Sequence, residues 1–347
     1  MTTMEQQERQ EQQEEAGPHT AALADVTSGR RLAAQPASAG AFYRHLIGMA
    51  RGLDAVRTAV VYPVDAASLA GAVEAAHAGL IEPVLIGPPA QIHAAARSAG
   101  VDVSPYGIVA ADHAAQAASQ AVALARAGQV DAIMKGALHT DELMRAVVDS
   151  RSGLRTDRRI SHVFVIDAPS YPRPLLITDA AINVRPTLAE KRDIVQNAID
   201  LALVLGIAEP CVAILSAVET VTDKLPATID AAALCKMADR GQIRGGVLDG
   251  PLAFDNAVSA QSAETKGIAS PVAGRADILV VPDLEAGNML AKELEYLGQA
   301  RIAGIVVGAR VPIVLTSRAD GTLARLTSCV VALLMARRPR GTGGADE

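Results

Sequence analysis

The sequence predicts a mixed α/β fold whose strands are mainly parallel. Short runs of β-branched and apolar residues alternate with longer stretches of helical spacing over most of the chain, as in repeated strand-helix-strand units. Hydrophobic residues make up 50% of the 347 residues, but aromatic residues only 2%. A core of Ala, Val, Leu and Ile suits helices layered on a parallel sheet, and this length is enough for two domains.

The first half of the chain supplies four of the expected strands. Residues 58–62 form a strand that ends at Pro63, and residues 83–86 form a strand that is closed by Gly and Pro. Residues 66–78 have the spacing of a helix with one apolar face. The other expected elements here are strands at 106–109 and 132–134 and helices at 40–55, 91–99 and 112–127.

The second half continues the alternation after a run of arginines that begins at Arg151, where we expect a domain boundary. A strand that starts at Gly245 is expected to open into a loop through Ala257. The other expected elements are strands at 162–167, 175–178, 211–215, 278–281, 304–307 and from 311, and helices at 188–205, 227–239, from 289, and at 322–337.

The composition excludes several classes of protein. The net charge of -6 and the lack of a basic patch argue against a nucleic-acid partner. The three cysteines are far apart and odd in number, so we expect reduced core residues and a cytoplasmic location. No stretch offers the roughly 20 apolar residues that span a bilayer, because Glu209 and Pro210 interrupt the longest candidate. Residues 1–36, which begin with a Gln and Glu tract, and residues 338–347 are expected to be disordered tails.

The stretch Val311–Gly321 is the strongest candidate for a functional site. A buried strand there leads directly into hydroxyls, a guanidinium and a carboxylate, at Thr316, Ser317, Arg318 and Asp320. In open α/β folds ligands bind outside the carboxyl ends of strands, so these groups would face a cleft. The alternative is that polar residues stand there only because a turn begins.

A second candidate is the segment from Lys135 to Thr140, which follows a strand and precedes a helix that carries Arg145. A lysine, backbone N–H groups and a helix amino terminus could receive an anion. The alternative is a solvated lysine and a helix-capping Thr140. Ser216 and Asn288 also follow strands, and we expect such polar strand ends to gather around one cleft.

Several familiar chemistries lack their sequence patterns. The histidines and cysteines show no metal-ligand spacing, so no metal site is expected. GxGxxG, GxxxxGK[ST] and GxSxG are all absent. The arginines at 151, 155, 158 and 159 could be a solvated connection or could meet the phosphates of a large ligand. The remaining groups are suited to binding anions and moving protons.

Several long motifs, in this order, resemble the phosphate acetyltransferase and phosphate butyryltransferase family. They are Lys135-Gly136 through Arg145, Ser216 to Thr220, Gly250 to Val258, Lys266 to Gly274, Val281 to Lys292 and Val311 to Asp320. The pattern is more similar to the butyryl branch, and to the acyltransferase part of bifunctional enoyl-CoA hydratase/phosphate acetyltransferase proteins, although the chain has no room for a hydratase domain.

The resemblance implies reversible transfer of an acyl group between coenzyme A and inorganic phosphate, by direct transfer with both substrates bound. It implies a two-domain isocitrate/isopropylmalate dehydrogenase-like fold with mainly parallel sheets and an interdomain cleft. The domains would be 37–151 plus 304–337, and 152–303. It also implies a homodimer, action alongside an acyl kinase, and no cofactor, because coenzyme A and phosphate are substrates.

The roles of individual residues come from the same resemblance. Ser317 and Arg318 match the catalytic Ser-Arg pair, in which the arginine binds phosphoryl oxygens. The acetyltransferase branch has an aspartate as base for the thiol seven residues after the serine, where this chain has Ala324, so Asp320 is the candidate base. The residues expected to bind coenzyme A or phosphate are Lys135, Thr140, Arg145, Ser216 and Asn288.

Two other functions remain as alternatives. An NAD-dependent decarboxylating dehydrogenase of the same fold would need a cluster of metal-binding carboxylates and a nucleotide loop, and neither is evident. A non-catalytic acyl-CoA-binding protein is compatible with the alanine at 324. Binding of coenzyme A without phosphate-dependent turnover would select it.

Overall fold

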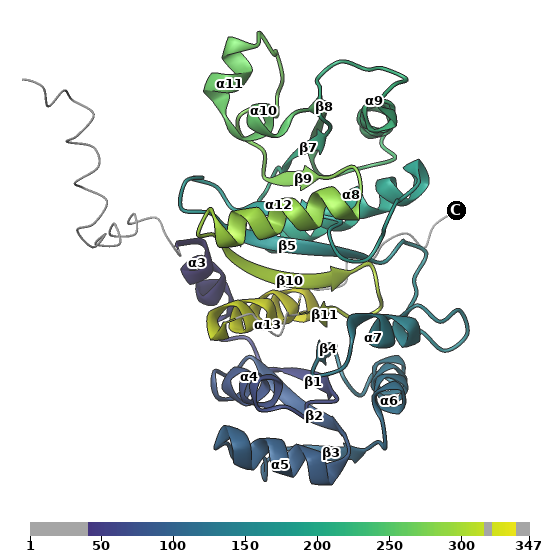
Figure 1. The fold of residues 1–347 in the computed structure, drawn as a ribbon, viewed down its shortest axis with the longest axis vertical. Coiled ribbons are helices and arrows are strands. Elements are labelled where there is room, and N and C mark those ends of the chain that lie inside the picture. Colours follow the sequence, from purple (N-terminus) through teal and green to yellow (C-terminus); the bar gives the residue numbers. More distant parts are fainter. Residues whose placement is uncertain (1–40, 316–320, 338–347) are drawn as a thin grey trace, which may run out of the picture. The chain divides into compact units, whose positions relative to one another are not determined.

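A computed structural model describes residues 41–315 and 321–337, which alternate between strands and helices along the chain (Figure 1). The strands are β1 (Val56–Val61), β2 (Ile81–Gly87), β3 (Gly107–Ala110), β4 (Ala132–Lys135), β5 (Ser161–Asp167), β6 (Leu175–Thr178), β7 (Cys211–Leu215), β8 (Val247–Leu252), β9 (Ile278–Val280), β10 (Arg301–Val307) and β11 (Ile313–Val314). The helices are α3 (Ala41–Ala50), α4 (Ala66–His77), α5 (Pro89–Ala99), α6 (Ala114–Arg126), α7 (Thr140–Val147), α8 (Leu188–Val204), α9 (Pro226–Asp239), α10 (Phe254–Val258), α11 (Ala260–Thr265), α12 (Leu284–Tyr296) and α13 (Thr322–Arg337).

The described strands form one sheet of eleven strands in the order β3-β2-β1-β4-β11-β10-β5-β6-β9-β7-β8. The predicted α/β class with mainly parallel strands is confirmed, but the strands share a single sheet instead of separate sheets. Antiparallel pairs occur at β10–β11, β10–β5 and β5–β6. The links from β5 to β6 and from β10 to β11 are too short for the crossover of a dozen or more residues that parallel neighbours require.

Helix boundaries follow local capping chemistry. The Asp65 carboxylate accepts a hydrogen bond from the Ser68 N–H at 2.7 Å and starts α4. The Asp283 carboxylate accepts one from the Ala286 N–H at 2.9 Å and starts α12. The prediction of a helix from residue 289 was therefore wrong at its start, and Asn288 lies inside the helix instead of in a loop.

Two other predicted elements differ from the structure. The helix predicted at 40–55 ends at Ala50, and Gly52 follows with a φ of 81°, a left-handed conformation that glycine adopts without steric cost. The loop predicted through Ala257 contains α10, and α11 follows it. Helices this short have too few residues for the apolar periodicity to be seen in sequence.

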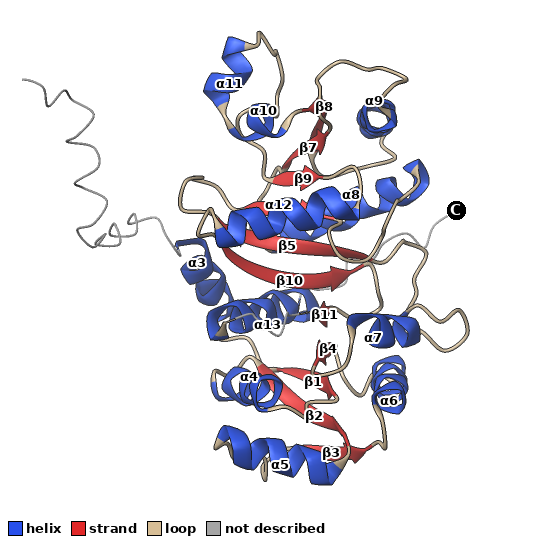
Figure 2. Cartoon of the chain, viewed as in Figure 1, coloured by secondary structure: helices blue, strands red, loops and turns tan. Residues whose placement is uncertain are grey.

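Helices cover both faces of the sheet (Figure 2). Alternate residues of β5 point to opposite faces: Val163 and Val165 belong to the core that α13 covers, whereas Ile166 belongs to the core beneath α12. On this second face, α7 covers one group of strands and α12 covers another. The predicted division into two domains stays a prediction, and the predicted tails at 1–36 and 338–347 lie outside the described residues. Within the described part of the chain, no helix combines the length and apolarity needed to cross a bilayer.

Candidate active site

A cavity of about 350 Å³ lies where β4, β5, β10 and β11 meet α7 and α12. Its walls combine apolar side chains with amine, imidazole, hydroxyl, amide and carboxylate groups. The lining residues are Lys135, Leu138, His139, Thr140, His162, Phe164, Ala181, Asn288, Ala291, Lys292, Glu295, Ile302, Gly304 and Leu315. The sequence predictions Lys135, Thr140 and Asn288 are thus brought together in one cavity.

The sheet brings distant parts of the sequence to this cavity. Met134 of β4 is paired with Val314 of β11, and Lys135 and Leu315 are the residues that follow each of them in the sequence. β10 and β5 continue the sheet beyond β11, and Gly304 is paired there with Phe164. Strands spaced by about 4.8 Å make this region roughly 14 Å wide from β4 to β5.

Lys135 is a buried side chain. The residue is 7% exposed, and its Nζ donates a hydrogen bond to the Gly136 carbonyl oxygen at 3.3 Å. The backbone folds tightly there, because a Cβ on Gly136 would lie 2.4 Å from the Val61 carbonyl oxygen. The alternative of a solvated loop lysine does not fit this burial, and a cationic amine inside a cavity favours an anionic ligand.

The amino terminus of α7 borders the same cavity. His139 is the N-cap residue, and its backbone N–H donates to the Glu142 carboxylate at 3.0 Å. Thr140 is therefore the first residue of the helix instead of its cap. The partial positive charge of a helix amino terminus adds to the preference for an anion.

Helix α12 and the loop after β6 form the opposite wall. The Asn288 amide donates to the Ala180 carbonyl oxygen at 3.3 Å, which joins helix and loop. The Asp179 carboxylate accepts hydrogen bonds from the N–H groups of Ala181 and Ile182, both at 3.0 Å. Burial raises the pKa of Asp179, and these hydrogen bonds act in the opposite direction. The loop is thus held by its own buried carboxylate.

Further along α12, a cation and an anion stand at the cavity wall. Lys292 Nζ lies 2.7 Å from Glu295 Oε2, so this cation is partly compensated by its neighbour. Ala291, between Asn288 and Lys292 in the sequence, contributes a small apolar surface.

His162 and Phe164 are lining residues that sequence reasoning missed. Both lie on one face of β5, and their rings make an edge-to-face contact with centroids 4.4 Å apart. Burial lowers the pKa of His162 to about 3, so its ring is neutral at physiological pH. The strand at 162–167 was predicted, but a histidine at the start of a buried strand gives no signal of which cavity it will line.

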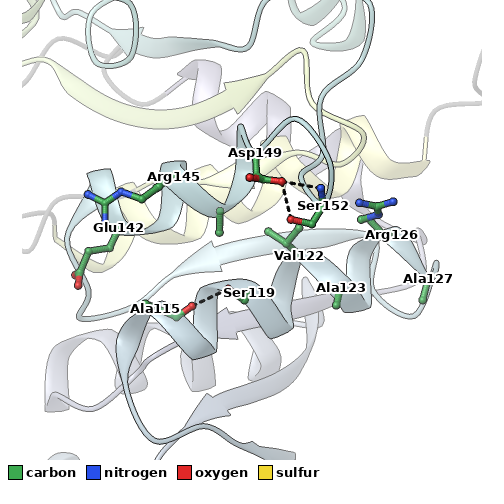
Figure 3. Close-up of a pocket in the computed structure, with 11 residues that line it drawn as sticks. Ala115, Ser119, Val122, Ala123, Arg126, Ala127, Glu142, Arg145, Asp149 and Ser152 are labelled. Carbon is green, nitrogen blue, oxygen red and sulfur yellow. Dashed lines mark hydrogen bonds between the residues drawn. The ribbon is translucent and has the colours of Figure 1, made fainter.

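Arg145 lies in a different hollow. It comes from the side of α7 that faces α6, in a groove that also holds Arg126, Asp149 and Ser152 (Figure 3). Its side chain is 75% exposed and lies 3.4 Å from Asp141. Arg145 lies five residues after Thr140 on the helix, so the two side chains point well over a right angle apart around the helix axis. Thr140 and Arg145 therefore do not share a cavity.

Ser216 is also absent from the cavity lining. It follows β7, which is separated from β5 by β6 and β9. Three strand spacings put β7 about 14 Å from β5. The roles predicted for Arg145 and Ser216 stay predictions.

The predicted catalytic residues Ser317, Arg318 and Asp320 lie outside the described residues, as does Thr316. Leu315, the residue that precedes them in the sequence, lines the cavity.

The arginine run after α7 forms a small hollow of its own. A space of about 180 Å³ is lined by Arg155, Arg158 and Arg159 together with Ile182 and Asn183. Arg159 forms an ion pair with Glu190 at 2.9 Å, and Arg158 pairs with Asp200. Ala181 lines the large cavity and Ile182 lines this hollow, so one loop borders both.

No group of three or more His, Cys, Asp or Glu side chains suited to a metal ion occurs among residues 41–315 and 321–337. The expected absence of a metal remains a prediction.

Comparison with known proteins places these features in one family. Residues 108–332 match the family described as "Phosphate acetyl/butaryl transferase". The chain is 60% identical over 293 residues to a phosphate acetyltransferase of Rickettsia prowazekii, covering 83% of this chain and 84% of that protein. It is 40% identical over 294 residues to a phosphate butyryltransferase of Clostridium acetobutylicum, covering 85% and 98%.

A solved structure has the same fold. The crystal structure of a branched-chain phosphotransacylase from Enterococcus faecalis superposes with a TM-score of 0.71 at 29% sequence identity. The match covers 81% of this chain and 99% of that one. The similarity therefore extends over nearly the whole length of a solved relative.

Proposed function

This chain belongs to the phosphate acetyl/butyryl transferase family and is a phosphate acyltransferase, and on that premise we propose that it catalyses acyl-CoA + phosphate = acyl phosphate + CoA in the cavity between α7 and α12. The observation that carries the proposal is the buried Lys135 in the same cavity as Thr140, Asn288 and Leu315. Leu315 lies two residues before the Ser-Arg pair in the sequence. Because the 60% identical relative is named an acetyltransferase, acetyl-CoA is the first substrate to test.

Phosphate occupies the side of the cavity that holds Lys135 and Thr140. A cationic amine and the helix amino terminus both stabilise a dianion. The acyl group occupies the side lined by Phe164, Ala291 and Ile302, where a short apolar chain loses contact with water. The reacting carbonyl then lies between the two, close to Leu315 and Gly304.

The residues after Leu315 complete this scheme. Arg318 neutralises charge on the phosphate through two parallel hydrogen bonds, and Ser317 donates to the reacting centre. Asp320 exchanges the proton of the coenzyme A thiol, whose ordinary pKa lies above neutral. Holding both substrates in one cavity makes the transfer effectively unimolecular, with no covalent enzyme intermediate.

Family membership supports a proposal about the wider setting of the reaction. We propose the two-domain isocitrate/isopropylmalate dehydrogenase-like arrangement, a homodimer, a cytoplasmic location, and action alongside an acyl kinase that consumes the acyl phosphate. The reaction uses no cofactor, since coenzyme A and phosphate are both substrates.

Phosphate-dependent release of free thiol from acetyl-, propionyl- and butyryl-CoA, without added metal, tests the activity. We expect turnover with one preferred chain length and its loss in Asp320→Asn, whereas the control Asp112→Asn, an exposed residue before α6, stays active. Initial-rate lines that intersect support a ternary complex, and parallel lines indicate a covalent intermediate. Coenzyme A binding without turnover would favour the non-catalytic alternative.

A further inference from the structure

His162 is a buried histidine at the cavity wall whose role no sequence motif assigns. The residue is 1% exposed, and it lies on β5 two residues before Phe164. Its ring leans toward β10, because Nε2 lies 2.9 Å from the position that a Cβ on Gly304 would take. The absence of a side chain at 304 therefore makes room for the imidazole.

The two ring nitrogens have different surroundings. Nδ1 is fully buried and has no hydrogen-bond partner among the residues that the structure describes. The ring therefore meets the cavity along the edge that carries Nε2, next to Gly304. A buried polar atom left without a partner costs free energy, and a catalytic role is one of the explanations for such an atom in a native protein.

The protonation state of the ring determines what it can offer. Burial lowers the pKa of His162 to about 3, so the ring carries one N–H. A proton on Nδ1 would be a buried donor without a partner, and orphaned donors are rarer inside proteins than orphaned acceptors. The tautomer with the proton on Nε2 leaves only an acceptor unsatisfied and directs its N–H toward the cavity.

We propose that His162 is a catalytic residue whose Nε2–H donates a hydrogen bond to the acyl carbonyl oxygen of the substrate, an inference that rests on the proposed function. The carbonyl is the right partner for a neutral donor. The phosphate dianion is better stabilised by cations such as Lys135, whereas the surroundings of His162 include the apolar side chains of Phe164 and Ile302. A neutral donor adds no net charge that would compete for phosphate.

The hydrogen bond acts where charge develops. A phosphate oxygen forms a bond to the thioester carbon, and the C=O π electrons move to the carbonyl oxygen. They return as the C–S bond breaks, and the coenzyme A thiolate leaves and takes up the proton that phosphate gives up. His162 neither gains nor loses a proton in this sequence. Its N–H stabilises the transient oxyanion, as positioned donors do in acyl transfer.

Two variants separate hydrogen bonding from packing. His162→Phe keeps a planar ring but has no donor, whereas His162→Gln keeps an N–H near the position of Nε2. We expect kcat with acetyl-CoA to be about 10²-fold lower in His162→Phe than in the wild type. In His162→Gln, kcat should be at least about tenfold higher than in His162→Phe, and KM for phosphate should be nearly unchanged in both variants. His93→Gln, an exposed histidine on α5, is the matched control. Equal activities of the two variants, or a more active Phe variant, would overturn the proposal.

Infrared spectroscopy of bound acetyl-CoA measures a property that would not change if His162 had only a structural role. With ¹³C at the thioester carbonyl, the C=O band should shift to lower frequency on binding to the wild-type protein and shift less in His162→Phe. An unshifted band in the wild type overturns the hydrogen bond even if the variants fail to fold. If the wild-type protein shows no turnover but the C=O band shifts on binding, the proposed function fails and the hydrogen bond to the carbonyl oxygen stands. Failure of the proposed function can therefore be told apart from failure of this inference.

Discussion

The backbone of Gly304 lies directly against that of Leu315: a Cβ atom on Gly304 would be 2.7 Å from the Leu315 carbonyl oxygen. The Gly304 N–H donates to Ser328 Oγ of α13 at 3.0 Å, which fixes β10 from the other side. Gly304 is thus held between His162, Leu315 and α13. Since Leu315 precedes the predicted catalytic segment, the position of Gly304 bears on both stability and activity.

Gly304→Ala should destabilise the protein by about 1–3 kcal/mol, the usual cost of forcing a group into a packed interior. Urea unfolding measures the loss, and thiol release should show lower activity in the folded variant. Gly48→Ala is the control, because nothing lies within 4 Å of a Cβ at that helical position. It should be neutral or stabilising, and equal stability of the two variants would contradict the close approach.

Lys135→Met should raise KM for phosphate about tenfold or more, the scale of losing one hydrogen bond to a charged group. The thioether keeps most of the volume of the buried chain. Initial rates at varied phosphate concentration measure the change, and Lys224→Met, an exposed residue before α9, is the control. An unchanged KM for phosphate with a raised KM for acyl-CoA would instead assign Lys135 to coenzyme A.

Arg318→Ala should lower turnover by about 10²-fold or more, the scale of losing one positioned electrostatic donor. Thiol release at saturating substrates measures it, with Arg97→Ala on α5 as an exposed control. Turnover close to that of the wild type would remove Arg318 from the mechanism.

Arg173→Met should destabilise the fold by about 1.5–3 kcal/mol, because it leaves a buried carboxylate without its cation. Asp277 is 1% exposed, and it accepts hydrogen bonds from Arg173 Nε at 2.9 Å and from Arg173 Nη2 at 3.0 Å. Lys236→Met breaks the exposed Lys236–Asp239 pair and should cost less than about 1 kcal/mol. Equal unfolding free energies of the two variants would show that burial of Asp277 does not matter.

Acid should release the turn after α7 at an unusually low pH. Asp149 accepts hydrogen bonds from the N–H groups of Arg151 and Ser152 and from the Ser152 hydroxyl, and these lower its pKa from 3.8 to about 2. A depressed pKa means that the stabilisation is complete above about pH 4 and is lost as the pH falls through 2. The ¹³C shift of the Asp149 carboxyl should titrate near 2, and a midpoint near 3.8 would contradict the turn. Asp149→Asn should lose the transition.

The sequence predicted elements best where local signals agree with burial. β6, β7 and α13 have the predicted bounds. β6 and β7 are short continuous buried runs that are followed by polar residues, and α13 has the apolar spacing of a helix. The cap at Asp283 was overlooked, so Asn288 was expected in a loop. The antiparallel direction of β10 depends on its partners in the sheet, which periodicity does not contain.

In the candidate site, too, some residues could be predicted from the sequence and others could not. Lys135, Thr140 and Asn288 stand at the ends of predicted strands or in motifs of the family, and they line one cavity. His162 and Phe164 lie within a strand, where a side chain's neighbours depend on pairing with β10. No property of either residue in the sequence distinguishes it from an ordinary core residue.

The two residues of β11 affect how the protein folds during its synthesis. They are the only strand between β4 and β10 in the described sheet, although β4 precedes them by about half of the length of the protein. During synthesis on the ribosome, the edge of β4 stays open from residue 135 until Ile313 emerges, and an open strand edge invites pairing with other chains. Completion of the sheet is therefore a late event in folding, and truncation before Ile313 should yield a chain that aggregates.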